Sequence, residues 1–79
     1  MKELKTIYWN RKTLNTAYIY FDKPKEAKTL AEELKQLNIG HTTYVEKDSD
    51  HILYGIKMFR IKNKMFQICS KLKEVLANG

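Results

Sequence analysis

The predicted secondary structure follows the same order twice along this chain, and this repetition limits the folds that it can adopt. Three residues of the first half recur 36 positions later: Thr6, Tyr8 and Tyr18 as Thr42, Tyr44 and Tyr54. Each half reads as strand, turn, strand and helix, which predicts two ββα half-units at about 4–39 and 41–77 within one domain, 1–79. The alternative is that any two amphipathic hairpin–helix units would align this well, without a duplication.

The first half begins with a hairpin. The first strand is expected at 5–9, where Thr, Ile, Tyr and Trp follow one another, and the polar residues 10–13 form its turn. In the second strand, 14–21, residues of two classes alternate with a period of two: Ala17, Ile19 and Phe21 with Thr16, Tyr18 and Tyr20. We expect the first set to face the core and the tyrosines to face the other side.

The first helix is the clearest element. Pro24 suits a first helical turn, where its missing N–H has no partner to lose. An apolar stripe at helical spacing follows: Ala27, Leu30, Ala31, Leu34 and Leu37. The sequence Asn38-Ile39-Gly40 then predicts a left-handed stop with a hydrophobic residue after the turn.

The second half repeats this order less regularly. A strand is expected at 42–46, a turn at 47–50, and a long strand at 51–61 in which apolar residues occupy both alternate sets of positions. A bulge or bend near Gly55 would switch the buried face partway along this strand. The last helix has its own stripe: Met65, Ile68, Cys69, Leu72, Val75 and Leu76.

These elements predict an α+β fold. Two hairpins and two helices favour a four-stranded, mainly antiparallel sheet in ββαββα order, with both helices on one face. The opposite face is then open, and the alternation puts Tyr18 and Tyr20 on it, with Tyr44 and either Tyr8 or Trp9 beside them.

The net charge of +6 is concentrated in the second half. Residues 1–50 hold nine Lys or Arg against eight Asp or Glu, whereas residues 51–79 hold six against Glu74 alone. A clustered basic surface is typical of a protein that binds a polyanion. A solvated face that promotes solubility is the simpler explanation, and the composition fits both.

An open sheet that carries tyrosines beside a basic segment is how many single-strand binders work, because bases stack on the rings and cations hold the phosphates. The sequence therefore predicts a small nucleic-acid-binding protein whose candidate site residues are Tyr18, Tyr20, Tyr44, Tyr54, Lys57, Arg60, Lys62 and Lys64. Tyrosine is also a good strand former that covers a wet face without a ligand. A third interpretation is a protein interface, either a homodimer through the open face or a phage- or mobile-element-type inhibitor or adaptor that docks on a host protein complex.

Other classes of function are disfavoured. The segment 48–51 gathers Asp48, Asp50 and His51, but calcium-loop spacing is absent and these residues also form ordinary turns. We find no phosphate-binding loop, dinucleotide motif or zinc spacing, so we expect neither an enzyme nor a cofactor or metal. The single cysteine, Cys69, suits a reducing cytoplasm, and no apolar run approaches a membrane span.

The order ββαββα, with LAEELKQLNIG in the first helix and ILYGIKMFRIKNKMF leading into the second, resembles the DNA-binding part of LAGLIDADG homing endonucleases. The acidic helix motif that supplies that family's catalytic carboxylates is absent here. The resemblance therefore implies DNA binding at most, and no nuclease activity.

Overall fold

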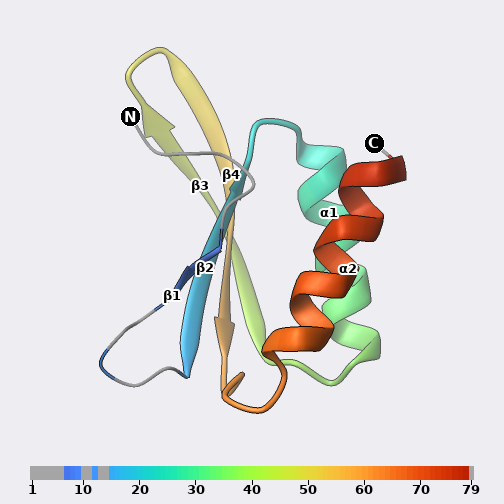
Figure 1. Ribbon diagram of the computed structural model, residues 1–79. Coiled ribbons are helices and arrows are strands. Elements are labelled where there is room, and N and C mark those ends of the chain that lie inside the picture. Colours follow the sequence, from blue (N-terminus) through green and yellow to red (C-terminus); the bar gives the residue numbers. More distant parts are fainter. Residues whose placement is uncertain (1–6, 10–11, 13–14, 79) are drawn as a thin grey trace.

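The computed structural model describes residues 7–9, 12 and 15–78. Its elements follow the order ββαββα (Figure 1). Their bounds are β1 Tyr8–Trp9, β2 Thr16–Phe21, α1 Pro24–Gln36, β3 His41–Asp48, β4 His51–Phe59 and α2 Met65–Asn78. The expected start of the first strand, most of the first turn and Thr6 of the repeat lie outside the described residues.

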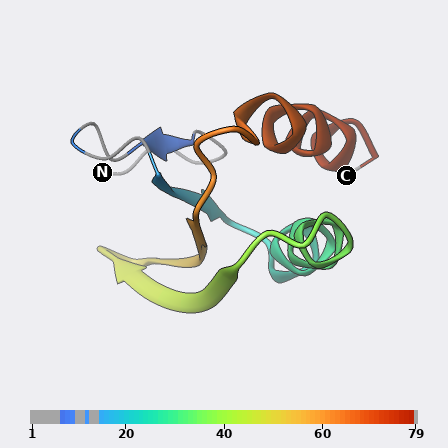
Figure 2. The same cartoon turned by 90° about the horizontal axis from the view of Figure 1, so that it is seen from below.

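The four strands form one antiparallel sheet in the order β1-β2-β4-β3. Both helices lie against the same face of this sheet, as Figures 1 and 2 show from two directions. The predicted α+β architecture is therefore confirmed. Since β2 and β3 are separated by β4, the chain crosses the helical face through α1 and leaves β3 as an outer strand of the sheet.

The core lies between the sheet and the helices. The alternation predicted for β2 is confirmed, because Ala17, Ile19 and Phe21 are fully buried and point toward the helices. The helices contribute buried residues at helical spacing: Leu30 and Leu34 from α1, and Ile68, Leu72 and Val75 from α2. Each large buried side chain stabilises the fold by about 1.5–3 kcal/mol relative to exposure, which makes this shared core the main source of stability.

The end of α1 follows the predicted pattern. Asn38 adopts a left-handed conformation with φ of 58°, and the backbone N–H of Ile39 donates to the carbonyl of Leu34 at 2.9 Å. Ile39 is buried directly after this turn. Asparagine adopts a left-handed conformation more readily than most residues, since its short polar side chain can hydrogen-bond locally. The stop brings Gly40 beside Phe59, whose N–H donates to the Gly40 carbonyl at 2.8 Å.

The prediction of a bulge or bend near Gly55 in β4 is wrong. Its pairing with β2 and with β3 runs in an unbroken register on both sides, through Gly55. Residues of both alternate sets are buried because β4 is a central strand, with Ile56 and Met58 under the helices and Leu53 on the other face. The strand ends at Phe59 because Arg60 adopts a left-handed φ of 53°.

The regular register also shows that residues aligned by the sequence repeat do not all occupy equivalent positions in the fold. Tyr8 pairs with Tyr18, and Tyr44 pairs with Gly55, so Tyr8 and Tyr44 share the face away from the helices. Tyr54 pairs with Phe21, a core residue, and therefore lies on the opposite face from Tyr18. The repeat holds for the order of the elements, whereas Tyr18 and Tyr54 are not equivalent in space.

Candidate nucleic-acid interface

We call the sheet face that points away from α1 and α2 the open face. The strand register assigns these residues to it: Tyr8, Thr16, Tyr18, Tyr20, Thr42, Tyr44, Glu46, Leu53, Gly55, Lys57 and Phe59. One row crosses all four strands, from Tyr8 through Tyr18 and Lys57 to Thr42. The open face therefore carries both aromatic and basic side chains, as the sequence predicted.

Three tyrosines of the open face pack against one another. The rings of Tyr8 and Tyr20, and those of Tyr20 and Tyr44, have centroids 6.0 Å apart in edge-on arrangements. The Tyr44 hydroxyl donates to the Tyr20 hydroxyl at 2.9 Å, and Tyr20 is only 7% exposed. Because Tyr20 is almost fully covered, this cluster contributes to the packing of the sheet more than to a free binding surface.

The hydroxyl of Tyr44 is strongly perturbed by this cluster. Partial burial, the hydrogen bond to Tyr20 and the nearby charge of Glu46 raise the pKa of Tyr44 well above its usual range. Each of these factors disfavours the tyrosinate anion. Tyr44 is therefore a neutral hydrogen-bond donor over the whole physiological pH range.

A second group, which we call the Lys57 strip, comprises Thr16, Tyr18, Lys57 and Phe59. The Lys57 ammonium lies 5.5 Å from the Tyr18 ring centroid and 5.3 Å from that of Phe59. Both distances fall within the range of cation–π attraction, which holds the lysine between the two rings. All four side chains are partly exposed. The strip thus presents a cation and two rings at one place on the open face.

The remaining basic candidates follow β4. Arg60 and Lys62 are exposed in the loop that begins beside the Lys57 strip. Lys64 points elsewhere, because its ammonium donates to the Asn38 carbonyl at 3.4 Å, at the C-terminal end of α1. The helix dipole favours a cation at that position, which gives Lys64 a local structural role.

Tyr54 does not belong to the open face, contrary to its inclusion in the predicted aromatic surface. Tyr54 and Lys57 are three residues apart, so a strand without a bulge places them on opposite faces. The ring of Tyr54 instead packs against the core and lines a groove beside α1. The Lys57 strip and Tyr54 are therefore separated by the sheet.

Two phenylalanines that were not predicted as site residues lie near the basic loop. Phe59 completes the Lys57 strip, and its position two residues after Lys57 was the available signal, since such residues share a face. Phe66 is 87% exposed in the first turn of α2. It lies outside the apolar stripe of that helix, and a residue outside such a stripe faces solvent.

Comparisons with known protein families, with curated proteins and with solved structures find no match for this chain. They add no support for the resemblance to the homing endonucleases. We therefore infer function from the geometry of the chain itself.

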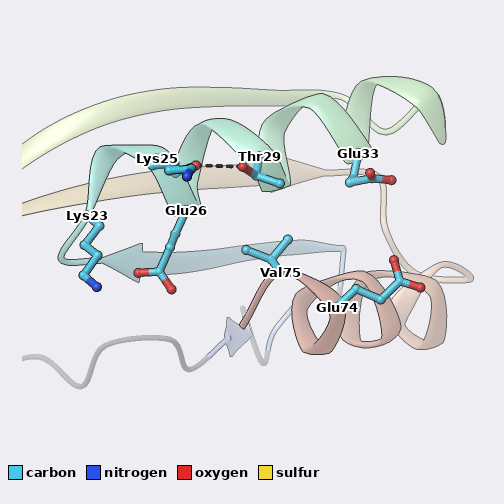
Figure 3. A pocket seen from close by; sticks show the side chains of 7 residues that line it. All are labelled: Lys23, Lys25, Glu26, Thr29, Glu33, Glu74 and Val75. Atoms are coloured by element: carbon cyan, nitrogen blue, oxygen red, sulfur yellow. Dashed lines mark hydrogen bonds between the residues drawn. The ribbon is translucent and has the colours of Figure 1, made fainter. Parts of the chain in front are cut away.

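A charged cavity of about 290 Å³ lies between the two helices (Figure 3). Glu33 of α1 and Glu74 of α2 both line this cavity, and the Lys71 ammonium lies 3.4 Å from each carboxylate. Glu74, and then Glu33, raise the pKa of Lys71. Glu26 lies nearly buried in the first turn of α1, where the helix dipole favours an acidic residue. The ion pairs of Lys71 therefore join the two helices beside this cavity.

The turn at 49–50 separates β3 from β4, and Ser49 adopts a left-handed φ of 56° there. Within residues 7–9, 12 and 15–78, no three His, Cys, Asp or Glu side chains are grouped closely enough to hold a metal ion. Over the same part of the chain, neither helix has the length and apolar character required to cross a membrane.

Proposed function

We propose that this protein is a non-enzymatic nucleic-acid-binding protein that uses the Lys57 strip together with Arg60 and Lys62. The observation that carries the proposal is the position of the Lys57 ammonium between the rings of Tyr18 and Phe59. Rings of this kind stack on unpaired bases, at about 1–3 kcal/mol per base, and the cation holds the neighbouring phosphate. We assign the protein to the cytoplasm, where its single cysteine remains reduced.

The charge around the strip supports the same function. Residues 51–73 contain six Lys or Arg and no Asp or Glu. Arg60 and Lys62 are exposed directly after the strip, whereas Lys71 is engaged by carboxylates between the helices. A phosphate backbone that enters the open face beside Phe59 would therefore meet further cations and no acidic side chain of this segment. Affinity from such contacts depends steeply on salt.

The position of the rings favours a single strand over a duplex. Tyr18 and Phe59 lie on the face of a sheet, and a base can reach a ring there only if it is unstacked and unpaired. A duplex would offer its phosphates to Lys57, Arg60 and Lys62 without using either ring. We expect single strands to bind more tightly than duplexes of the same sequence.

The proposal is tested by fluorescence anisotropy with labelled DNA and RNA oligonucleotides of about 20 nucleotides, a length that exceeds the site of a typical small single-strand-binding domain. Single strands and matched duplexes are titrated at about 50 and about 300 mM salt, which separates the electrostatic contribution from the stacking contribution. We expect preference for single strands at both concentrations and weaker binding at high salt. Failure to bind any oligonucleotide at the lower salt concentration would refute the proposal.

The alternative function is docking on another protein, as a compact inhibitor or adaptor of the phage or mobile-element type. The observation that favours it is Phe66, because a large aromatic side chain with 87% exposure is the kind of anchor that protein interfaces bury. Capture from a nuclease-treated lysate distinguishes the two functions. A stoichiometric protein that is retained at high salt by the wild type and by Lys57→Gln, but is not retained by Phe66→Ala, would support docking.

A further inference from the structure

Strand β3 leaves one edge of the sheet unpaired within the described part of the chain. It is eight residues long and, among the described strands, pairs with β4 alone. An outer strand of this length offers its backbone N–H and C=O groups to another strand. Val45, near its middle, points to the helical side and is 66% exposed, so the edge combines backbone groups that pair with no other described strand with an uncovered apolar side chain.

A groove of about 420 Å³ runs between this edge and α1. The α1 side is formed by Pro24, Ala27, Ala31 and one charged residue, Lys28, and the strand side includes Thr43 and Val45. A strand added at the edge of β3 would direct alternate side chains into this groove, because side chains of neighbouring strands share faces. The two alanines and Val45 therefore offer an apolar contact to one side chain of an added strand, beside the Lys28 cation.

We propose that the occupant is β3 of a second copy of this chain, so that the protein forms a dimer through an antiparallel β3–β3 pair. A two-fold axis at Val45 places Val45 of one copy opposite Val45 of the other, on the helical side and at the groove. The same register places Thr43 opposite Lys47 and Tyr44 opposite Glu46. In this register no like charges lie directly opposite one another across the pair, an arrangement that would be destabilising.

Neighbouring registers fit less well. With the axis at Glu46, two glutamates face each other, which is destabilising. With the axis at Tyr44, Val45 faces Thr43 and the two exposed valines no longer cover each other. A shift of one residue in the pairing would put the helices of the two copies on opposite sides of the sheet and leave both grooves unfilled. Of the registers compared, the one centred on Val45 therefore suits the pairing of two β3 strands best.

This dimer leaves the open face accessible, so it is independent of the proposed nucleic-acid binding. The contact consists of one strand pair and two short grooves, which corresponds to the small, transient class of interface, below about 1,200 Å². We therefore expect a concentration-dependent equilibrium between the 9.4 kDa chain and a dimer of twice that mass.

Sedimentation equilibrium between about 10 and about 500 μM, the range in which weak interfaces associate, tests the dimer. Val45→Lys sets two lysines against each other at the axis and should give a monomer at every concentration. Ile52→Lys is the control, because Ile52 is also an exposed apolar residue, at 53%, but it lies on β4, opposite Lys47 and on the inner side of β3. Circular dichroism confirms that both variants are folded.

The expected result is a dimer for the wild type and Ile52→Lys and a monomer for Val45→Lys. A wild-type protein that remains monomeric throughout would overturn the proposal. Association that persists in Val45→Lys would also overturn it and would indicate a contact elsewhere, such as the open face. Equal loss of association in both lysine variants would indicate general apolar association and would contradict a β3 edge pair.

Discussion

The ring of Tyr44 covers Gly55 on the neighbouring strand. A Cβ placed on Gly55 would stand 2.6 Å from Cζ of Tyr44 and 2.8 Å from Cε2, closer than carbon atoms approach without displacement. The glycine is needed for this close approach and not for an unusual backbone, since its register with both neighbours is regular. The contact lets Tyr44 reach the Tyr20 hydroxyl across β4.

Gly55→Ala should therefore lower the free energy of unfolding by about 1–3 kcal/mol, the usual cost of an overpacked site. Gly40→Ala is the control, because its added Cβ would lie 3.9 Å from Phe59 Cβ, an ordinary contact. Urea denaturation followed by the fluorescence of Trp9, the single tryptophan, measures both. If Gly55→Ala were as stable as the wild type, the ring of Tyr44 would have to occupy another position.

Tyr44→Phe should reduce stability by about 1 kcal/mol near neutral pH, because it removes the hydrogen bond to Tyr20. The difference should shrink as the pH rises. Because the pKa of Tyr44 is raised in the folded state, the unfolded chain loses this proton first, from about pH 10, and wild-type stability falls from there. Phenylalanine has no such proton to lose.

Urea denaturation followed by circular dichroism at about pH 7, 9 and 10.5 compares the two proteins across this transition. Both contain the same lysines, so their shared titration cancels in the difference. If the difference in free energy of unfolding between wild type and Tyr44→Phe stayed constant over this range, the raised pKa of Tyr44 in the folded state would be contradicted.

Arg60→Gly should separate stability from binding. A left-handed conformation costs a residue with a Cβ roughly 1 kcal/mol, so glycine at this position should keep or raise the stability. The same change removes a cation beside the Lys57 strip and should weaken oligonucleotide binding. Ser49→Gly relieves the same kind of backbone strain at the other end of β4 and should leave binding unchanged. If Arg60→Gly bound oligonucleotides as tightly as wild type, Arg60 would not be part of the interface.

The order of the elements could be predicted from the sequence because local patterns determine it. The stripe of α1, the left-handed stop at Asn38 and the alternation of β2 each depend on residues a few positions apart. The end of β4 was harder to predict from the sequence. Ile61 is buried like a strand residue, yet the strand has already ended because the backbone turns at Arg60. A left-handed φ at Arg60 cannot be predicted from the local pattern of apolar residues.

The candidate site was only partly predictable for a related reason. In β4, apolar residues at both alternate sets of positions fit either a bulge or a central strand covered on both faces, and the strand order decides between them. The choice between a bulge and a regular central strand also determines on which face of the sheet Tyr54 lies. The edge-on packing of Tyr20 also depends on Tyr8 and Tyr44 of other strands, so the sequence of β2 alone cannot indicate that its ring is covered.

The central claim is that the Lys57 strip binds single-stranded nucleic acid, and a comparison of Lys57→Gln with Lys28→Gln tests it most directly. Both variants lack one positive charge of the wild type, but Lys28 lies on α1, on the other side of the sheet. Affinity for a labelled single strand is measured from about 50 to about 300 mM salt. Phe59→Leu, measured alongside, removes a ring while an apolar side chain remains.

We predict that Lys57→Gln binds more weakly than wild type, while Lys28→Gln binds equally well. The slope of log affinity against log salt should become shallower in Lys57→Gln by about 0.7 for each phosphate that is no longer neutralised. Phe59→Leu should weaken binding by about 1–3 kcal/mol with an unchanged salt slope, because stacking does not release counterions. Equal effects of Lys57→Gln and Lys28→Gln, with no effect of Phe59→Leu, would show that any binding is diffuse attraction to net charge and would contradict the account.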